Sequence, residues 1–148
     1  MTTQTSEPAA SAKVHIKSEG HWDWHIPTPF SQVIKAGRTV YVGGQLSADE
    51  KGNVIGHGDI EVQTRNVFDN ITKMLSAAGA RWSDVVKLNT YYVFNGDNAD
   101  AQAFWEKMTR VRLEYLANPG PVATAVRVAG LMYDGFLVEA DVIAVVDE

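Results

Sequence analysis

The sequence contains no cysteine. That absence excludes a disulfide framework, a catalytic thiol, and zinc or iron sites built on cysteine. Long hydrophobic runs are also missing, since none approaches the roughly 18 residues that a membrane-spanning helix requires. Residues 1–13 lack the basic start and the apolar centre of a secretory signal. We therefore expect a cytoplasmic protein without a membrane partner.

Positive charge is scarce as well. Thirteen lysines and arginines stand against eighteen aspartates and glutamates, which gives a net charge of −5, and the basic residues are scattered along the chain. Proteins that bind nucleic acid usually carry a basic patch or stripe, so we expect no nucleic-acid partner.

What the chain does contain is typical of a folded domain. It has 148 residues, of which 45% are apolar and 21% charged, and this excludes disorder, collagen and repeat arrays as the main architecture. Residues 1–13 are mostly small or polar and can bury too little surface to offset the entropy cost of ordering. We predict a mobile tail over 1–13 and a single domain over 14–148.

Hydrophobic periodicity and turn signals predict two helices and several strands. Asp59 is placed to cap a helix whose apolar residues recur about every 3.6 positions and stop before Gly79. The pair Asp134-Gly135 favours a tight turn and predicts a hairpin between the last two strands. The expected order is two strands, helix, strand, helix and two strands. The expected helices cover 60–78 and 99–116, and the strands with assigned bounds cover 39–45, 85–94, 122–131 and 136–146.

This order predicts an α+β fold in which two helices cover a single layer of sheet. Such helices cover only one face of the sheet. The last strand, Val138–Val146, is apolar on both faces in its second half, so the other face needs a second cover. A homo-oligomer would supply it.

A series of short motifs runs along the chain. They are Pro29-Phe30-Ser31-Gln32, Gly43-Gly44-Gln45-Leu46, Gln63-Thr64-Arg65, Asn70-Ile71, Ala77-Ala78-Gly79-Ala80, Asp84-Val85-Val86-Lys87, Pro121 followed by the run 126–131, and the run 138–144. In this order and spacing they resemble the reactive intermediate deaminase family (RidA/YjgF). The resemblance covers about residues 26–146 and leaves 14–26 as an N-terminal extension outside the shared pattern.

The resemblance implies a chorismate-mutase-like fold that assembles as a homotrimer, with small-molecule clefts at the subunit interfaces. It also implies hydrolysis of enamines or imines with release of ammonia. Well-studied members need no metal and no organic cofactor, so we expect none here.

The chain departs from the family where the substrate carboxylate is held. In well-studied members, an arginine two residues after the proline that corresponds to Pro121 grips this carboxylate, and here that position is Ala123. An alanine cannot form the bidentate, charge-assisted hydrogen bonds of an arginine. We therefore expect a substrate other than simple 2-imino acids. By resemblance, Ala123, Thr124 and Ala125 belong to the substrate-binding set.

Glu139 is the candidate catalytic residue. It stands between Val138 and Ala140, where burial would raise its pKa toward values useful for proton transfer. From the residues alone, an ion pair with a basic residue of a neighbouring chain is the commoner arrangement. The resemblance favours a glutamate that positions water.

Two further positions enter the candidate site by resemblance. Phe30 is expected to line the cleft, and Gly44 to let the backbone approach the ligand. A core aromatic and a turn glycine are the alternatives for these two residues.

The segment His21-Trp22-Asp23-Trp24-His25 lies outside the family pattern. If it is extended, its histidines and aspartate share one face and its tryptophans the other. Residues two apart on a strand are about 6.6 Å apart, too far to converge on one metal ion, so we predict no metal site. A solvated polar face with docked tryptophans is the simplest interpretation. His25 could alternatively replace the lost anion contact, beside Trp24.

Tyr91 and Tyr92 lie on opposite faces of a predicted strand, so at most one of them faces the cleft. Tyr91 is retained as a candidate.

Two functions from different classes remain after these observations. One is a cofactor-independent hydrolase of the enamine or imine deaminase type, acting on a planar substrate such as an intermediate of aromatic catabolism. The other is a non-catalytic, trimeric small-molecule-binding protein that retains the cleft. The glutamate at position 139 favours the first, and the alanine at position 123 favours the second.

Overall fold

The computed structural model describes residues 12–147. Most of the predicted tail therefore lies outside the described residues. Lys13, which the prediction included in the tail, is already the first residue of a strand.

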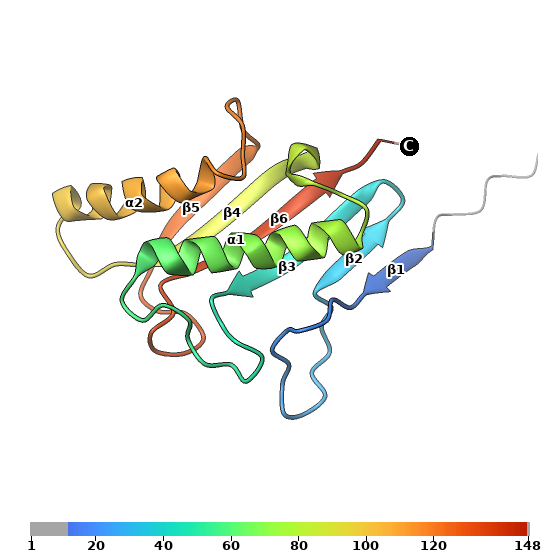
Figure 1. Ribbon diagram of the computed structural model, residues 1–148, viewed down its shortest axis with the longest axis horizontal. Helices are drawn as coiled ribbons and strands as arrows, with labels where there is room; N and C mark the ends of the chain where they lie inside the picture. Colours follow the sequence, from blue (N-terminus) through green and yellow to red (C-terminus); the bar gives the residue numbers. More distant parts are fainter. Residues whose placement is uncertain (1–11, 148) are drawn as a thin grey trace, which may run out of the picture.

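Residues 12–147 form one sheet and two α-helices (Figure 1), which confirms the α+β prediction. Three strands precede the first helix, one more than the sequence analysis predicted. The strands are β1 (Lys13–Ile16), β2 (Val33–Ala36), β3 (Thr39–Leu46), β4 (Val85–Val93), β5 (Val122–Val128) and β6 (Val138–Val145), and the helices are α1 (Ile60–Ala77), α2 (Asn98–Arg112) and the short 3-10 helix η1 (Trp82–Asp84).

The helices begin where the sequence places their caps. The Asp59 carboxylate accepts hydrogen bonds from the backbone N–H groups of Glu61 and Val62, which satisfies donors that the first turn leaves free. Asp97 caps α2 in the same way, by accepting from the backbone of Asp100. Over the described residues, neither helix is both long and apolar enough to cross a membrane.

The strand order in the sheet is β1-β2-β3-β6-β4-β5. The predicted hairpin between the last two strands is therefore wrong, because β4 lies between β5 and β6. Helix α2 carries the chain from β4 to β5, and these two strands pair in parallel, whereas β6 pairs antiparallel with both β3 and β4. Gly135 does adopt a positive φ of 93°, but it bends a loop that crosses to the centre of the sheet.

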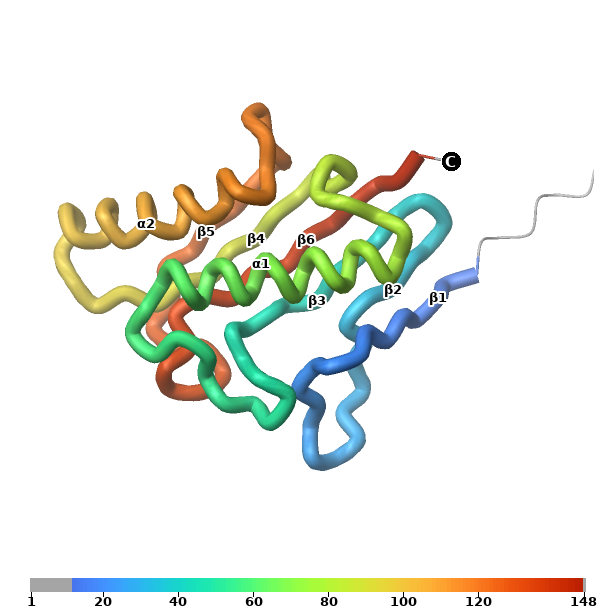
Figure 2. The backbone as a smooth tube through the Cα atoms, viewed as in Figure 1, coloured from blue at the N-terminus to red at the C-terminus, as the bar shows by residue number. Residues whose placement is uncertain are grey.

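The core lies between the helices and one face of the sheet. Both helices lie on this same face, as Figures 1 and 2 show. Phe68 of α1 is fully buried and stacks on Trp82, with ring centroids 4.9 Å apart. From β6 the pleat sends Val138, Ala140 and Val142 into this core.

The opposite face of the sheet carries exposed apolar side chains. Tyr41, Val122 and Val126 are 48%, 74% and 41% exposed. All three are in register with β4 or β6 residues of this face. Within residues 12–147, no helix covers this face. The expected second cover by other copies of the chain remains a prediction.

Replacing Phe68 by alanine should lower the free energy of unfolding by about 3–5 kcal/mol, since it removes a fully buried ring from a packed core. Urea denaturation followed by circular dichroism measures this change. Leu113→Ala is the control, because Leu113 is 63% exposed, and it should cost less than about 1 kcal/mol. Equal losses in the two variants would contradict the described core.

Candidate functional site

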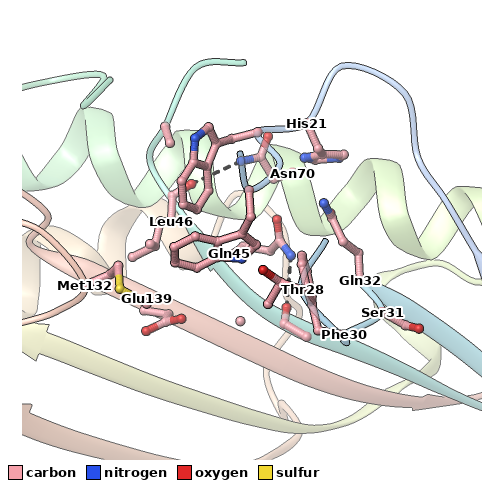
Figure 3. A pocket seen from close by; sticks show the side chains of 15 residues that line it. His21, Thr28, Phe30, Ser31, Gln32, Gln45, Leu46, Asn70, Met132 and Glu139 are labelled. Atoms are coloured by element: carbon pink, nitrogen blue, oxygen red, sulfur yellow. Dashed lines mark hydrogen bonds between the residues drawn. The ribbon is translucent and has the colours of Figure 1, made fainter. Parts of the chain in front are cut away.

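A cavity of about 430 Å³ opens beside the end of β3 and the start of β6. Its wall comes from the N-terminal segment before β2, from the Gly43-Gly44 region of β3, from Asn70 of α1, and from Met132 and Glu139 (Figure 3). Of the candidate residues, Trp24, Phe30, Gly44 and Glu139 all line it. The fold thus brings together residues that the sequence places more than a hundred positions apart.

Glu139 reaches the cavity from the face of the sheet that the helices do not cover. In β6 it is in register with Leu46 of β3 and with Tyr91 of β4. A Cβ atom at position 44 would collide with the Glu139 carboxylate, so Gly44 allows this carboxylate to lie against the backbone of β3. The expected approach of the Gly44 backbone to a ligand remains a prediction.

The environment of Glu139 favours its protonated form. Burial raises the pKa of this carboxyl, and the nearby negative charge of Asp141 raises it further. Asp141 is itself held in place, because Asn89 Nδ2 donates a hydrogen bond of 2.9 Å to its Oδ1. Within residues 12–147 Glu139 forms no ion pair. The alternative of an ion pair with a neighbouring chain stays a prediction.

The segment from His21 to His25 is a loop, not a strand, and its predicted division into two faces holds except at His21. Trp22 and Trp24 contact each other, with ring centroids 4.6 Å apart, and both line the cavity. His21 lines the same cavity, whereas His25 and Asp23 line a neighbouring hollow. His21 is therefore the one residue of this segment that departs from the predicted alternation.

Tyr91 and Tyr92 lie on opposite faces of β4, as predicted. Tyr92 packs under α2 against Phe104 and Trp105. Tyr91 is therefore the residue that shares the face of Glu139, but it does not line the cavity of this chain.

The three candidate residues of β5 also lie outside the cavity. Ala123, Thr124 and Ala125 belong to the edge strand beyond β4, and only Thr124 shares the face of Glu139. Their contribution to a cleft at a subunit interface remains a prediction about the assembled protein.

Several polar residues of the cavity were not among the predicted site residues, His21, Gln32 and Asn70 among them. Gln32 and Asn70 stand within the motifs quoted above, but nothing in their local pattern separates a cavity wall from a solvated surface. Asn70 Nδ2 donates a 3.3 Å hydrogen bond to the carbonyl oxygen of Leu46, which ties α1 to the end of β3.

Comparison with known proteins gives a consistent result. The family model described as Endoribonuclease L-PSP matches residues 25–146. A RutC family protein of Pyrococcus horikoshii is 40% identical over 78% of this chain and 86% of its own. The 3-aminoacrylate deaminase RutC of Acinetobacter baylyi is 35% identical over 75% and 82%.

Two further similarities extend this result. The 2-iminobutanoate/2-iminopropanoate deaminase of Dermatophagoides farinae is 32% identical over 70% of this chain and 75% of its own. Among solved structures, RidA from Psychrobacter sp. is 30% identical and superimposes with a TM-score of 0.73, covering 90% of this chain and 99% of that one.

The raised pKa of Glu139 predicts a pH-dependent effect on stability. A carboxyl whose pKa is higher in the folded protein stabilises it most below the ordinary value of 4.5, and this contribution is lost as the pH rises through the raised pKa. Glu139→Gln should therefore raise the Tm by a few degrees at pH 8 and leave it nearly unchanged at pH 4. Thermal denaturation at both pH values measures this, with the exposed Glu106→Gln as the control. A lower Tm at pH 8 would contradict the described environment.

Proposed function

Since the chain belongs to the RidA/YjgF family, we propose that it is a cofactor-independent hydrolase that removes ammonia from an enamine or an imine. The observation that carries this proposal is the half-buried Glu139 carboxyl at a cavity lined by aromatic side chains. Two relatives are deaminases by name, which supports the reaction class.

The reaction needs one water and a group that exchanges protons. An enamine first takes a proton from solvent at carbon and becomes an iminium ion, as an imine does when it is protonated at nitrogen. Water then attacks the carbon of the C=N bond while the Glu139 carboxylate takes one proton from that water, which gives a neutral carbinolamine. Glu139 returns this proton to the nitrogen, the C–N bond breaks and ammonia leaves, and the hydroxyl group loses its remaining proton to solvent as the carbonyl product forms.

The position of Glu139 suits this exchange. A pKa above the ordinary value brings the carboxyl closer to neutral pH, so it can both accept and return a proton. The carboxylate lies close to Gly44 near the end of β3 and lines the cavity, where a bound substrate would meet it.

Two features indicate the chemical class of the substrate, namely the aromatic wall of the cavity and the alanine at position 123. Trp22, Trp24 and Phe30 offer aromatic surface suited to a planar molecule, such as an intermediate of aromatic catabolism. Ala123 offers no charged group to a carboxylate, so we propose a substrate other than simple 2-imino acids.

The same alanine supports a second candidate, a trimeric binding protein that retains the cavity without the chemistry. Turnover separates the two functions. Binding of planar compounds without ammonia release from any enamine or imine would favour the binding protein.

Glu139→Gln should lower turnover by about 10²–10⁴-fold, the usual contribution of a positioned acid or base. Ammonia release from a panel of enamines and imines generated in situ, with simple 2-imino acids included, measures this effect. Glu106→Gln, on the exposed side of α2, should leave turnover unchanged. Full activity of the Glu139→Gln protein would remove Glu139 from the mechanism.

We also propose a homotrimer in which the uncovered face of the sheet lies inside the assembly. Light scattering at micromolar concentration should then give about three times the chain mass of 16.2 kDa. Val126→Lys should reduce that mass by placing a charge in an apolar interface, whereas Leu113→Lys, beyond the end of α2, should not. A monomeric wild-type protein would overturn this assembly.

A further inference from the structure

The wall of the cavity carries no positive side chain that could pair with a negatively charged ligand. Among residues 12–147, no lysine and no arginine lines it, and its titratable side chains in that range are His21 and Glu139. Burial lowers the pKa of His21, and the positive charge of Lys73 lowers it further, so this ring is uncharged at pH 8. The charge that a ligand meets at the wall is therefore that of the Glu139 carboxylate.

Aromatic side chains form a large part of the remaining wall. Trp22, Trp24 and Phe30 line the same cavity as Glu139 (Figure 3). The ring centroids of Trp22 and Trp24 are 4.6 Å apart and the ring planes are inclined at 56°, so the two rings form a corner. Phe30 is 50% exposed and both tryptophans are partly exposed, so a ligand in the cavity can contact these side chains.

We propose that this cavity binds an organic cation, held by the aromatic rings of Trp22, Trp24 and Phe30 and by the Glu139 carboxylate. This inference deepens the proposed function and rests on it for the identity of the natural ligand. The substrate class that follows is an enamine or imine that bears no carboxylate and is bound as its positively charged iminium ion.

The aromatic wall favours a positive ligand over a neutral one. The π electrons give each face of an aromatic ring a partial negative charge, which attracts cations. The attraction is strongest for tryptophan and grows when the site is shielded from water, and sites for quaternary ammonium groups are built from several such rings. A neutral planar molecule would gain the same apolar contact without this electrostatic attraction.

Glu139 gives a second, independent reason for a positive ligand. Its carboxyl is half-buried, and within residues 12–147 it forms no ion pair. Asp141, two residues further along the same face of β6, adds a second negative charge. A partly buried carboxylate without a counter-ion is unfavourable, so a bound cation would supply the missing partner. A ligand carboxylate would instead be repelled.

Packing holds the aromatic corner in place without a ligand. A Cβ atom at position 52 would collide with the Trp22 ring, so Gly52 leaves the space in which this ring lies. Trp22 also contacts Tyr133 edge-on, with ring centroids 6.1 Å apart, and Trp24 packs in turn against Trp22. A preformed site loses less conformational freedom on binding, which favours affinity.

A cation site also suits the proposed reaction. The species that water attacks is an iminium ion, and its positive charge would lie against the aromatic rings and close to the Glu139 carboxylate. The same carboxylate takes the proton from the attacking water. The cavity would thus favour the protonated form of an imine over its neutral form at the place where the reaction occurs.

Three planar probes of similar size and different charge test this assignment: N-methylpyridinium is positive, toluene is uncharged and benzoate is negative. Their binding to the full chain is measured at pH 8 and constant ionic strength by ligand-observed NMR. N-methylpyridinium should bind about 10-fold more tightly than toluene, the gain expected from cation–π contacts in a partly shielded site. Benzoate should bind most weakly of the three.

Trp24 is the aromatic residue to replace, because Trp22 packs on the body of the protein. Trp24→Leu should reduce the preference for N-methylpyridinium over toluene to about 3-fold, and Trp24→Phe should give an intermediate value, since phenylalanine attracts cations less strongly than tryptophan. Leucine keeps apolar surface, so toluene binding reports any damage to packing. The phenylalanine variant keeps the test decisive if the leucine variant folds poorly.

Replacing the carboxylate tests the other half of the site. Glu139→Gln should lower the preference for N-methylpyridinium over toluene by about 3-fold, because it removes the negative charge that faces the cation. Glu106→Gln makes the same substitution at an exposed position outside the cavity and should leave the preference unchanged.

Binding and turnover together separate this inference from the proposed function. A cation preference that depends on Trp24 and Glu139, without ammonia release from any enamine or imine, would sustain the cation site and overturn the proposed reaction. Ammonia release from a protein that binds toluene as tightly as N-methylpyridinium would do the reverse. A cation preference that survives both Trp24→Leu and Glu139→Gln would also overturn the cation site, because the charge would then be recognised elsewhere.

Discussion

Strand β6 runs through the middle of the sheet, and its pleat sets both the core and the position of Glu139. Because β6 lies between β3 and β4, it must place alternate side chains in the core, and Val138, Ala140 and Val142 do so. The same alternation sends Glu139 and Asp141 to the face that the helices leave open. A strand that completes the core thereby presents a carboxyl to the cavity.

The position of Glu139 works against stability and in favour of reactivity. Burial and the charge of Asp141 both oppose its ionisation, and ionisation at neutral pH therefore weakens the fold. Gly44 leaves the space that lets the carboxylate stay beside β3. The N-terminal segment adds the aromatic side chains of Trp22, Trp24 and Phe30 to the wall of the cavity that Glu139 lines.

Much of the fold could be predicted because its signals are local. The helix from Asp59 follows from a capping side chain and an apolar repeat, and the opposite directions of Tyr91 and Tyr92 follow from strand geometry. The prediction of a hairpin between the last two strands failed because a turn signal such as Asp134-Gly135 indicates where the chain bends. It does not indicate which strand the next segment pairs with. The single-face prediction for His21 and His25 failed because a loop without strand pairing has no fixed alternation, and His21 lines the cavity beside the tryptophans.

The two helices, the opposite faces of Tyr91 and Tyr92, and the family motifs could all be predicted from the sequence alone. Only the tertiary structure decided that β6 lies between β3 and β4, that His21 and Gln32 meet at one cavity, and that Ala123 lies on an edge strand away from it. The physical reason is that propensity, capping and periodicity act over a few residues. Strand pairing and cavity walls instead join segments that are distant along the chain, through backbone hydrogen bonds that any sequence can form.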